Sequence, residues 1–301
     1  MIRIKQFISV LFLSTLMACG STVSDTTEET GQQVGDAMAS IDEGGGSTSG
    51  TFAYQQNIES AKRTFARLSP ADIEPTLLDK LVGSVYPIQS AHAGLCSLES
   101  TFSSCASNVM TRTFSGCTIG AATVTGTVAL NFTDAAVDNT CSLASVGHAV
   151  ARTPAFVITG RRGATLTVSK AGTNGQVLTK GSGSTFTFSN DGIRRAFSGA
   201  ATFDFTTQTT SSITVTGTSR SGRVMTGGNL RVTNNTTSVT CDFVPTNVTW
   251  VATCNCATSG SWAGTCSDGK TSSLSITGCG TATVTLGTSS TSVTFDRCFS
   301  S

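Results

Sequence analysis

The chain has 301 residues, of which 38% are hydrophobic and only 12% are charged, with 31 glycines, 5 prolines and 11 cysteines. Glycine-rich composition with so few charges argues against a helical bundle and leaves room for one large or two modest domains. Nineteen basic and eighteen acidic residues almost balance, so the overall charge indicates no particular partner.

Residues 1–18 have the pattern of a secretory signal peptide. Arg3 and Lys5 precede an apolar run over 7–17, after which the chain turns polar and acidic. This run is too short to cross a membrane as a helix, which needs about twenty apolar residues. We therefore expect residues 1–18 to direct export and to be removed.

The end of this segment, Leu16-Met17-Ala18-Cys19-Gly20, resembles the lipobox of bacterial lipoproteins that the type II signal peptidase cleaves. The resemblance implies cleavage before Cys19, a diacylglyceryl thioether on its sulfur and usually an amide-linked acyl chain such as palmitate on its amine. Two or three acyl chains hold a protein stably on a bilayer. Met17 departs from the usual pattern. Gly20, in place of Asp, implies the outer membrane, with the protein facing the periplasm or the cell surface; the alternative is an ordinary signal peptide with a chance cysteine.

Residues 19–50 should form a flexible tether. They contain six acidic residues and no basic one, and they end in the Gly/Ser-rich run 44–50. Such a segment buries too little apolar surface to offset its ordering entropy. The acidic residues are Asp25, Glu28, Glu29, Asp36, Asp42 and Glu43.

Residues 51–90 are predicted to form two short helices. The first has an apolar side that includes Phe65 and Leu68. The second would begin with Ser69 as its N-cap, Pro70 at its first position and Asp72 in its first turn.

Residues 91–301 alternate apolar residues with Thr or Ser, a period of two that predicts strands with one buried face. The fold class we expect is mainly β, an antiparallel meandering sandwich or flattened barrel, stapled by disulfides and preceded by the short helical neck. Turn signals recur at Asn174-Gly175, Asp191-Gly192, Gly227-Gly228 and Asp268-Gly269. Of these, Asp191-Gly192 and Asp268-Gly269 should be two-residue hairpin turns.

Eleven cysteines less Cys19 leave ten, an even number in an exported chain, which favours disulfides. Pairing nearest neighbours predicts Cys96 with Cys105, Cys117 with Cys141, Cys241 with Cys254, Cys256 with Cys266, and Cys279 with Cys298, with swaps among the middle four cysteines as the main uncertainty. A zinc site at Cys254, Cys256 and Cys266 is the alternative, but C-x-C is not the usual spacing and both histidines, His92 and His148, are distant. We expect neither a metal nor another cofactor.

Catalytic patterns are scarce. Residues 96–301 contain one glutamate, seven aspartates and a single histidine, His148, with no nucleophile elbow and no phosphate-binding loop. A hydrolase with His148 as the base stays open, and the convergence of His148 with a carboxylate or serine in a pocket would favour it.

Two features indicate binding. Between Arg152 and Arg231, ten basic residues accompany only two acidic ones, so Arg161, Arg162, Arg194 and Arg195 are candidates for binding a polyanion such as lipopolysaccharide. Strand alternation, however, would send neighbouring arginines to opposite faces or into turns, and solvated edges are the simpler interpretation. Trp262, among small residues, is a candidate for stacking on a glycan, whereas Trp250 is expected in the core.

In composition, residues 96–301 resemble Thr/Ser-rich surface lipoproteins of Gram-negative bacteria, a group that implies no activity. The expected function is a non-catalytic outer-membrane lipoprotein in surface binding, adhesion or envelope structure. Its partners would be the membrane and a glycan, lipopolysaccharide or envelope protein, with no specific nucleic acid. Alternatives are the His148 hydrolase and a periplasmic carrier of a lipid or small molecule, which would need an apolar cavity.

Overall fold

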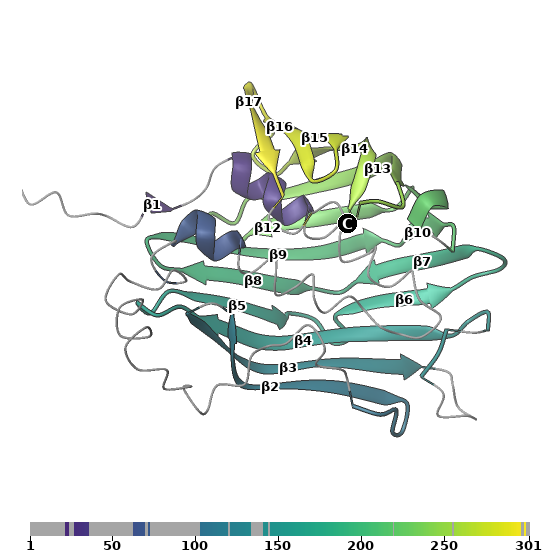
Figure 1. Ribbon diagram of the computed structural model, residues 1–301. Coiled ribbons are helices and arrows are strands. Elements are labelled where there is room, and N and C mark those ends of the chain that lie inside the picture. The colour runs from purple at the N-terminus through teal and green to yellow at the C-terminus, as the bar shows by residue number, and fades with distance from the viewer. Residues whose placement is uncertain are drawn as a thin grey trace, which may run out of the picture.

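The computed structural model describes residues 22–23, 27–35, 63–69, 72, 103–119, 121–133, 141–143, 145–218, 220–254, 256–295 and 298. These residues form a large β-sheet with two short helices against it (Figure 1). The strands are β1 Thr22–Val23, β2 Val109–Ile119, β3 Ala122–Thr133, β4 Ala149–Thr159, β5 Thr165–Lys170, β6 Gln176–Lys180, β7 Thr185–Asn190, β8 Ile193–Ser198, β9 Ala201–Ser211, β10 Ile213–Thr216, β11 Val224–Thr226, β12 Asn229–Asn234, β13 Thr240–Trp250, β14 Ala257–Cys266, β15 Thr271–Gly278, β16 Thr281–Leu286 and β17 Ser289–Thr294.

Apart from β1, the strand pairs are antiparallel and follow the chain as a meander. In the middle of the sheet, two short strands lie end to end beside one long strand: β5 pairs with the second half of β4 and β6 with its first half. β8 and β7 also lie end to end, as do β9 and β10. β12 and β11 lie end to end beside the long strand β13. The pairings thus form a ring, β4–β5–β8–β9–β12–β13–β11–β10–β7–β6, and not a clean barrel.

The predicted hairpin at Asp191-Gly192 is wrong. These residues join β7 to β8, which lie in line and do not pair with each other. The carboxylate of Asp191 accepts hydrogen bonds of 2.7 Å from the backbone N–H groups of Asn174 and Gly175, in the segment that joins β5 to β6. Gly192, at φ 139°, is needed for a kink inside a row of strands and not for a reversal.

The hairpin at Asp268-Gly269 is confirmed, with a longer loop than expected. β14 and β15 pair on either side of it, and the Cys266 N–H donates to the Lys270 carbonyl at 2.8 Å. Three residues, 267–269, therefore form the loop, and Gly269 takes the positive φ of 82° that such loops require.

Side chains alternate between a buried inner face and an outer face rich in Thr and Ser, as the period of two predicts. The inner face forms one apolar core that extends across the sheet, with Leu130, Phe205, Phe243 and Trp262 among its most buried members. The prediction of a mainly β, antiparallel, meandering and disulfide-stapled fold with short N-terminal helices is confirmed.

Both helices, residues 27–35 and 63–68, pack against the inner face (the purple and blue coils of Figure 1). The Phe65 ring meets that of Phe197 on β8 edge to face, with centroids 5.2 Å apart. The helix over 63–68 lies where the first neck helix was expected. The second, from Ser69 onward, lies outside the described residues except for Ser69 and Asp72.

The flexible tether expected over 19–50 is wrong for residues 27–35, because residues 29–35 are all buried. Two glycines let this polar helix approach the sheet: a Cβ on Gly31 would lie 2.4 Å from Val284, and one on Gly35 would lie 2.5 Å from Phe295. Its polar groups find partners, since Gln32 donates to the Thr294 carbonyl at 2.6 Å. Close backbone contact and satisfied hydrogen bonds thus replace the apolar face that a sequence pattern would reveal.

The structure contains the disulfides Cys105–Cys141, Cys241–Cys266, Cys254–Cys279 and Cys256–Cys298, and Cys117 is also disulfide-bonded. The prediction of disulfides is confirmed for these nine cysteines, and Cys96 lies outside the described residues. All five predicted pairings are wrong. The predictions paired cysteines that are close in sequence, whereas strand register brings cysteines together in space. Cys241 and Cys266, for example, are direct partners across β13 and β14.

Candidate functional site

Arg161 and Arg162 lie together, exposed, in the turn between β4 and β5. Asp72 holds this turn. Its carbonyl accepts the Arg161 N–H at 3.1 Å, and its carboxylate accepts the Arg162 N–H as well as the Ser69 hydroxyl. Asp72 is 3% exposed, and Gly160 leaves the space that it fills. The turn is therefore rigidly placed, with Arg162 at its surface.

Arg194 and Arg195 point to opposite faces of β8, as strand alternation predicts. Arg194 is on the outer face, where its Nε donates to Asp204 at 2.9 Å; this hydrogen bond lowers the pKa of the Asp204 carboxyl. Arg195 faces inward, where its charge acts on the buried Glu29. The four candidate arginines thus do not form a single patch: the structure brings only Arg161 and Arg162 together.

Trp262 is 0% exposed, so its expected role in stacking on a glycan is wrong. It lies between Pro245 on β13 and Leu274 on β15 in the strand register, within the core. Trp250 is 3% exposed, which confirms its predicted place in the core.

His148 stands just before β4, where its carbonyl accepts the Lys180 N–H at 2.8 Å. Among the described residues, no hydrogen bond or ion pair joins its imidazole to a carboxylate or a serine. Within the same part of the chain, no group of three His, Cys, Asp or Glu residues is placed to hold a metal ion. The convergence that would favour a hydrolase is not found there.

Sequence reasoning missed a buried ionic cluster under the 27–35 helix. Glu29 is 1% exposed. Its carboxylate accepts a hydrogen bond of 2.7 Å from Gln33 and forms an ion pair of 3.1 Å with Arg67. Burial raises the pKa of the Glu29 carboxyl, and the charges of Arg67 and Arg195 oppose that rise. An acidic residue in a seemingly flexible segment gave no signal of this role.

A hollow of about 460 Å³ opens at the end of the sheet that carries the Arg161-Arg162 turn. The β8–β9 turn forms its other wall, and β1 pairs in parallel beside that turn, Thr22 with Ala201 and Val23 with Thr202. In Figure 1, β1 lies at the left end of the sheet, near the blue helix. The hollow is lined by Leu68, Ser69, Asp72, Arg162, Gly163, Ala164, Ser198, Gly199 and Ala200.

A row of hydroxyl side chains crosses the outer face of five neighbouring strands, β13 to β17. The register places its members directly opposite one another, and none of them is buried. We call this the hydroxyl row: Thr246, Ser261, Ser275, Thr283 and Ser292.

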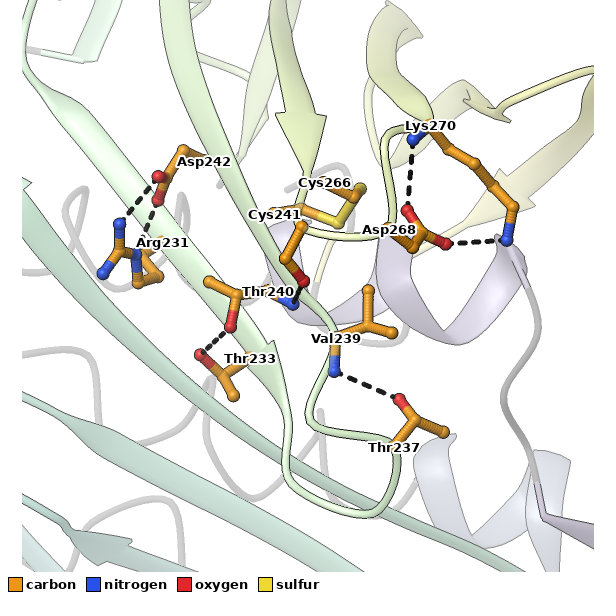
Figure 2. Close-up of a disulfide and its surroundings, with 11 residues drawn as sticks. Arg231, Thr233, Thr237, Val239, Thr240, Cys241, Asp242, Cys266, Asp268 and Lys270 are labelled. Atoms are coloured by element: carbon orange, nitrogen blue, oxygen red, sulfur yellow. Dashed lines mark hydrogen bonds and ion pairs between the residues drawn. A yellow bond between two sulfur atoms is a disulfide. The ribbon is translucent and has the colours of Figure 1, made fainter.

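The strands that carry the hydroxyl row have few charged residues, although the Ser292 end of the row borders a hollow that Glu28, Arg63 and Arg67 also line. Residues 243–295 contain only two charged side chains, Asp268 and Lys270, and these pair with each other at 2.7 Å. Figure 2 shows this pair beside the Cys241–Cys266 disulfide, with the Arg231–Asp242 ion pair on the adjoining strands β12 and β13. On β12 to β17 the charges of the described residues thus form matched pairs, and those of the two helices lie at the Ser292 end of the row.

No family model, curated protein or solved structure matches this chain. In the part of the chain that the structure describes, no helix is long and apolar enough to span a membrane.

Proposed function

We propose that the protein is a non-catalytic outer-membrane lipoprotein that binds neutral polysaccharide of the cell envelope through the hydroxyl row. The neutral hydroxyl surface over β13–β17 is the observation that carries this proposal. The anchor is the acylated Cys19 that the lipobox implies, and the disulfides fit an oxidising compartment outside the cytoplasm.

Hydroxyl groups both donate and accept hydrogen bonds, as sugar hydroxyls do, so a row of them can match a neutral glycan without a charged group on either side. Burying an unmatched charge costs far more than burying a hydroxyl, so a nearly chargeless surface suits a neutral ligand and disfavours a polyanion. Adjacent strands lie about 4.8 Å apart, which gives the row a length of roughly 19 Å. That length suits an extended polymer better than a small molecule.

The anchor is tested by membrane fractionation of cells that produce the wild type or Cys19→Ala. The wild type should sediment with outer membranes and the variant should not. A variant that still sediments with membranes would refute the anchor. Protease treatment of intact cells then decides whether the surface faces outward.

The binding surface is tested with Ser275→Lys/Thr283→Lys, which puts two charges at register partners in the hydroxyl row. The matched control is Thr123→Lys/Thr159→Lys, an exposed register pair on the outer face of β3 and β4. Retention on cellulose, on amylose and on the neutral polysaccharide fraction of bacterial envelopes should fall at least tenfold for the first variant only. Equal retention of both variants would place the binding site elsewhere, and no retention of the wild type would refute the glycan as ligand.

A further inference from the structure

The direction of β1 shows where the anchor must lie. β1 runs parallel to β9, whose first residues follow the β8–β9 turn. Going backward along the chain from Thr22 therefore means going off the sheet at the end that carries this turn. The same end carries the turn with Arg161 and Arg162 and the hollow between the two turns.

The distance from this end to the anchor is short. Three peptide units separate Cys19 from Thr22, and fully extended chain spans at most ~3.6 Å per residue, so the two Cα atoms lie no more than about 11 Å apart. An acyl group on Cys19 must sit in the bilayer. The sheet end next to Thr22 is thus held within about one headgroup layer of the membrane.

The chemistry of this end suits a layer of lipid phosphates. Arg161 and Arg162 are exposed there, and no described residue forms an ion pair with the Arg162 guanidinium. Arginine binds phosphate oxygens through two parallel N–H bonds. Gly163, Gly199 and Ala200 keep the walls of the hollow small, which leaves room for a headgroup beside Arg162.

One negative charge, Asp72, lies in the same hollow. Its carboxylate already accepts the Ser69 hydroxyl and the Arg162 N–H, and it is almost fully buried. Hydrogen bonds and burial thus hold this charge in the wall, while the arginine side chain extends from the exposed turn.

We propose that this end of the sheet docks on the membrane surface, with Arg162, assisted by Arg161, binding phospholipid headgroup phosphate. The inference rests on the lipid anchor of the proposed function. It fixes the orientation of the strands beside β1: β8 and β9 extend away from the bilayer.

The test uses the mature chain from residue 19 with Cys19→Ser, which keeps every described residue but cannot be acylated. Its sedimentation is measured with phosphatidylcholine vesicles that contain either no or about 30% phosphatidylglycerol, at low salt. Each basic residue near an anionic surface strengthens binding about fivefold, so Arg161→Gln/Arg162→Gln should weaken binding to the anionic vesicles roughly 25-fold.

The matched control is Lys170→Gln/Lys180→Gln, which removes the same charge away from this end. Lys180 lies level with His148, before the start of β4, whereas Arg161 follows the end of β4; at ~3.3 Å per residue the two are about 40 Å apart. The control should bind as the unmutated chain does. An equal loss in both variants, or none in the arginine variant, would overturn the proposal.

Two further measurements distinguish failure of the docking surface from failure of the lipid anchor. Inorganic phosphate alone is titrated against the same chain; binding of phosphate without binding of anionic vesicles would overturn membrane docking. Mass spectrometry of the native N-terminus reports acylation independently. An unacylated Cys19 refutes the anchor and the orientation drawn from it, whereas an acylated Cys19 with no arginine effect refutes only the docking surface.

Discussion

The Nη2 atom of Arg67 lies 3.1 Å from Oε2 of Glu29, so an ion pair that is buried on the acidic side joins the two N-terminal helices on the inner face of the sheet. Arg67 comes from the 63–68 helix and Glu29 from the 27–35 helix. Gln33 and the charge of Arg195 also act on this carboxylate.

The buried Glu29 in this cluster predicts that the free energy of unfolding depends on pH in an unusual way. Burial raises the pKa of Glu29 above its ordinary value of 4.5, so the folded state takes up a proton more readily than the unfolded state. The contribution of Glu29 to stability is therefore full below pH 4.5 and is lost as the pH rises through the folded pKa. We expect the free energy of unfolding of Glu29→Gln, relative to wild type, to increase as the pH rises from about 4 to 8.

Denaturant unfolding at several pH values measures this difference. Glu28→Gln is the matched control, since Glu28 carries the same charge 3.8 Å from Arg67 but its side chain is 46% exposed. The control should follow the wild-type pH profile. A free energy of unfolding of Glu29→Gln that falls, relative to wild type, as the pH rises would contradict the raised pKa.

The contact between the 27–35 helix and the sheet predicts that a Gly→Ala substitution in this helix destabilises the fold, the opposite of its effect in an isolated helix. In an isolated helix, Gly→Ala stabilises by about 1 kcal/mol. At Gly31, however, the new methyl group would lie 2.4 Å from Val284 Cγ2, so Gly31→Ala should instead destabilise the fold by about 1–3 kcal/mol.

Thermal unfolding checks this effect against Gly278→Ala, where the new Cβ meets only the Thr281 hydroxyl, at 3.1 Å. The control should change stability little. If Gly31→Ala were neutral as well, residues 27–35 would be the flexible tether that their composition indicates.

The burial of Trp262 predicts that it stabilises the fold and does not contact ligand directly. Trp262→Ala should cost about 3–5 kcal/mol, because it removes a fully buried indole and leaves a cavity. The neighbouring outward side chain provides the control: Ser261→Ala should leave the urea midpoint nearly unchanged. A folded Trp262→Ala protein of wild-type stability would show that the indole is not in the core.

The strand periodicity was enough to predict the sheet, its antiparallel meander and its two faces, because each alternating run reports directly on one buried side. The periodicity could not show that two short strands lie end to end in the sheet, since this depends on their pairing with neighbouring strands. Asp191-Gly192 has the sequence of a hairpin turn, yet its carboxylate is used to bridge a kink. The same Asp-Gly sequence suits a hairpin turn and the kink between β7 and β8, so the sequence alone does not distinguish them.

The candidate site was harder to predict, because its signals have two meanings. Small residues around Trp262 indicated exposure, but Gly264 is small since a Cβ there would lie 1.8 Å from the Asp242 carbonyl of the neighbouring strand. Arg161 and Arg162 were found from charge alone. Their partner Asp72 and the position of β1 follow only from tertiary contacts between segments far apart in the chain.

The disulfides yield a last prediction, which concerns the C-terminal end of the fold. Cys256–Cys298 closes a separation of 42 residues and Cys241–Cys266 one of 25. Loop entropy alone gives each about 3–4 kcal/mol. Cys298 also accepts a hydrogen bond from Arg63 at its carbonyl, so its bond secures the 63–68 helix as well.

We therefore expect Cys256→Ser/Cys298→Ser to become sensitive to protease in the 63–68 region, whereas Cys241→Ser/Cys266→Ser, with a similar loss of stability, should not. Limited proteolysis followed by mass spectrometry locates the first cuts.

A non-reducing digest of the wild type checks the pairing itself: peptides that link Cys254 to Cys279 and Cys256 to Cys298 are expected. Peptides that link Cys279 to Cys298 would instead restore the pairing of nearest neighbours and refute the Cys256–Cys298 bond.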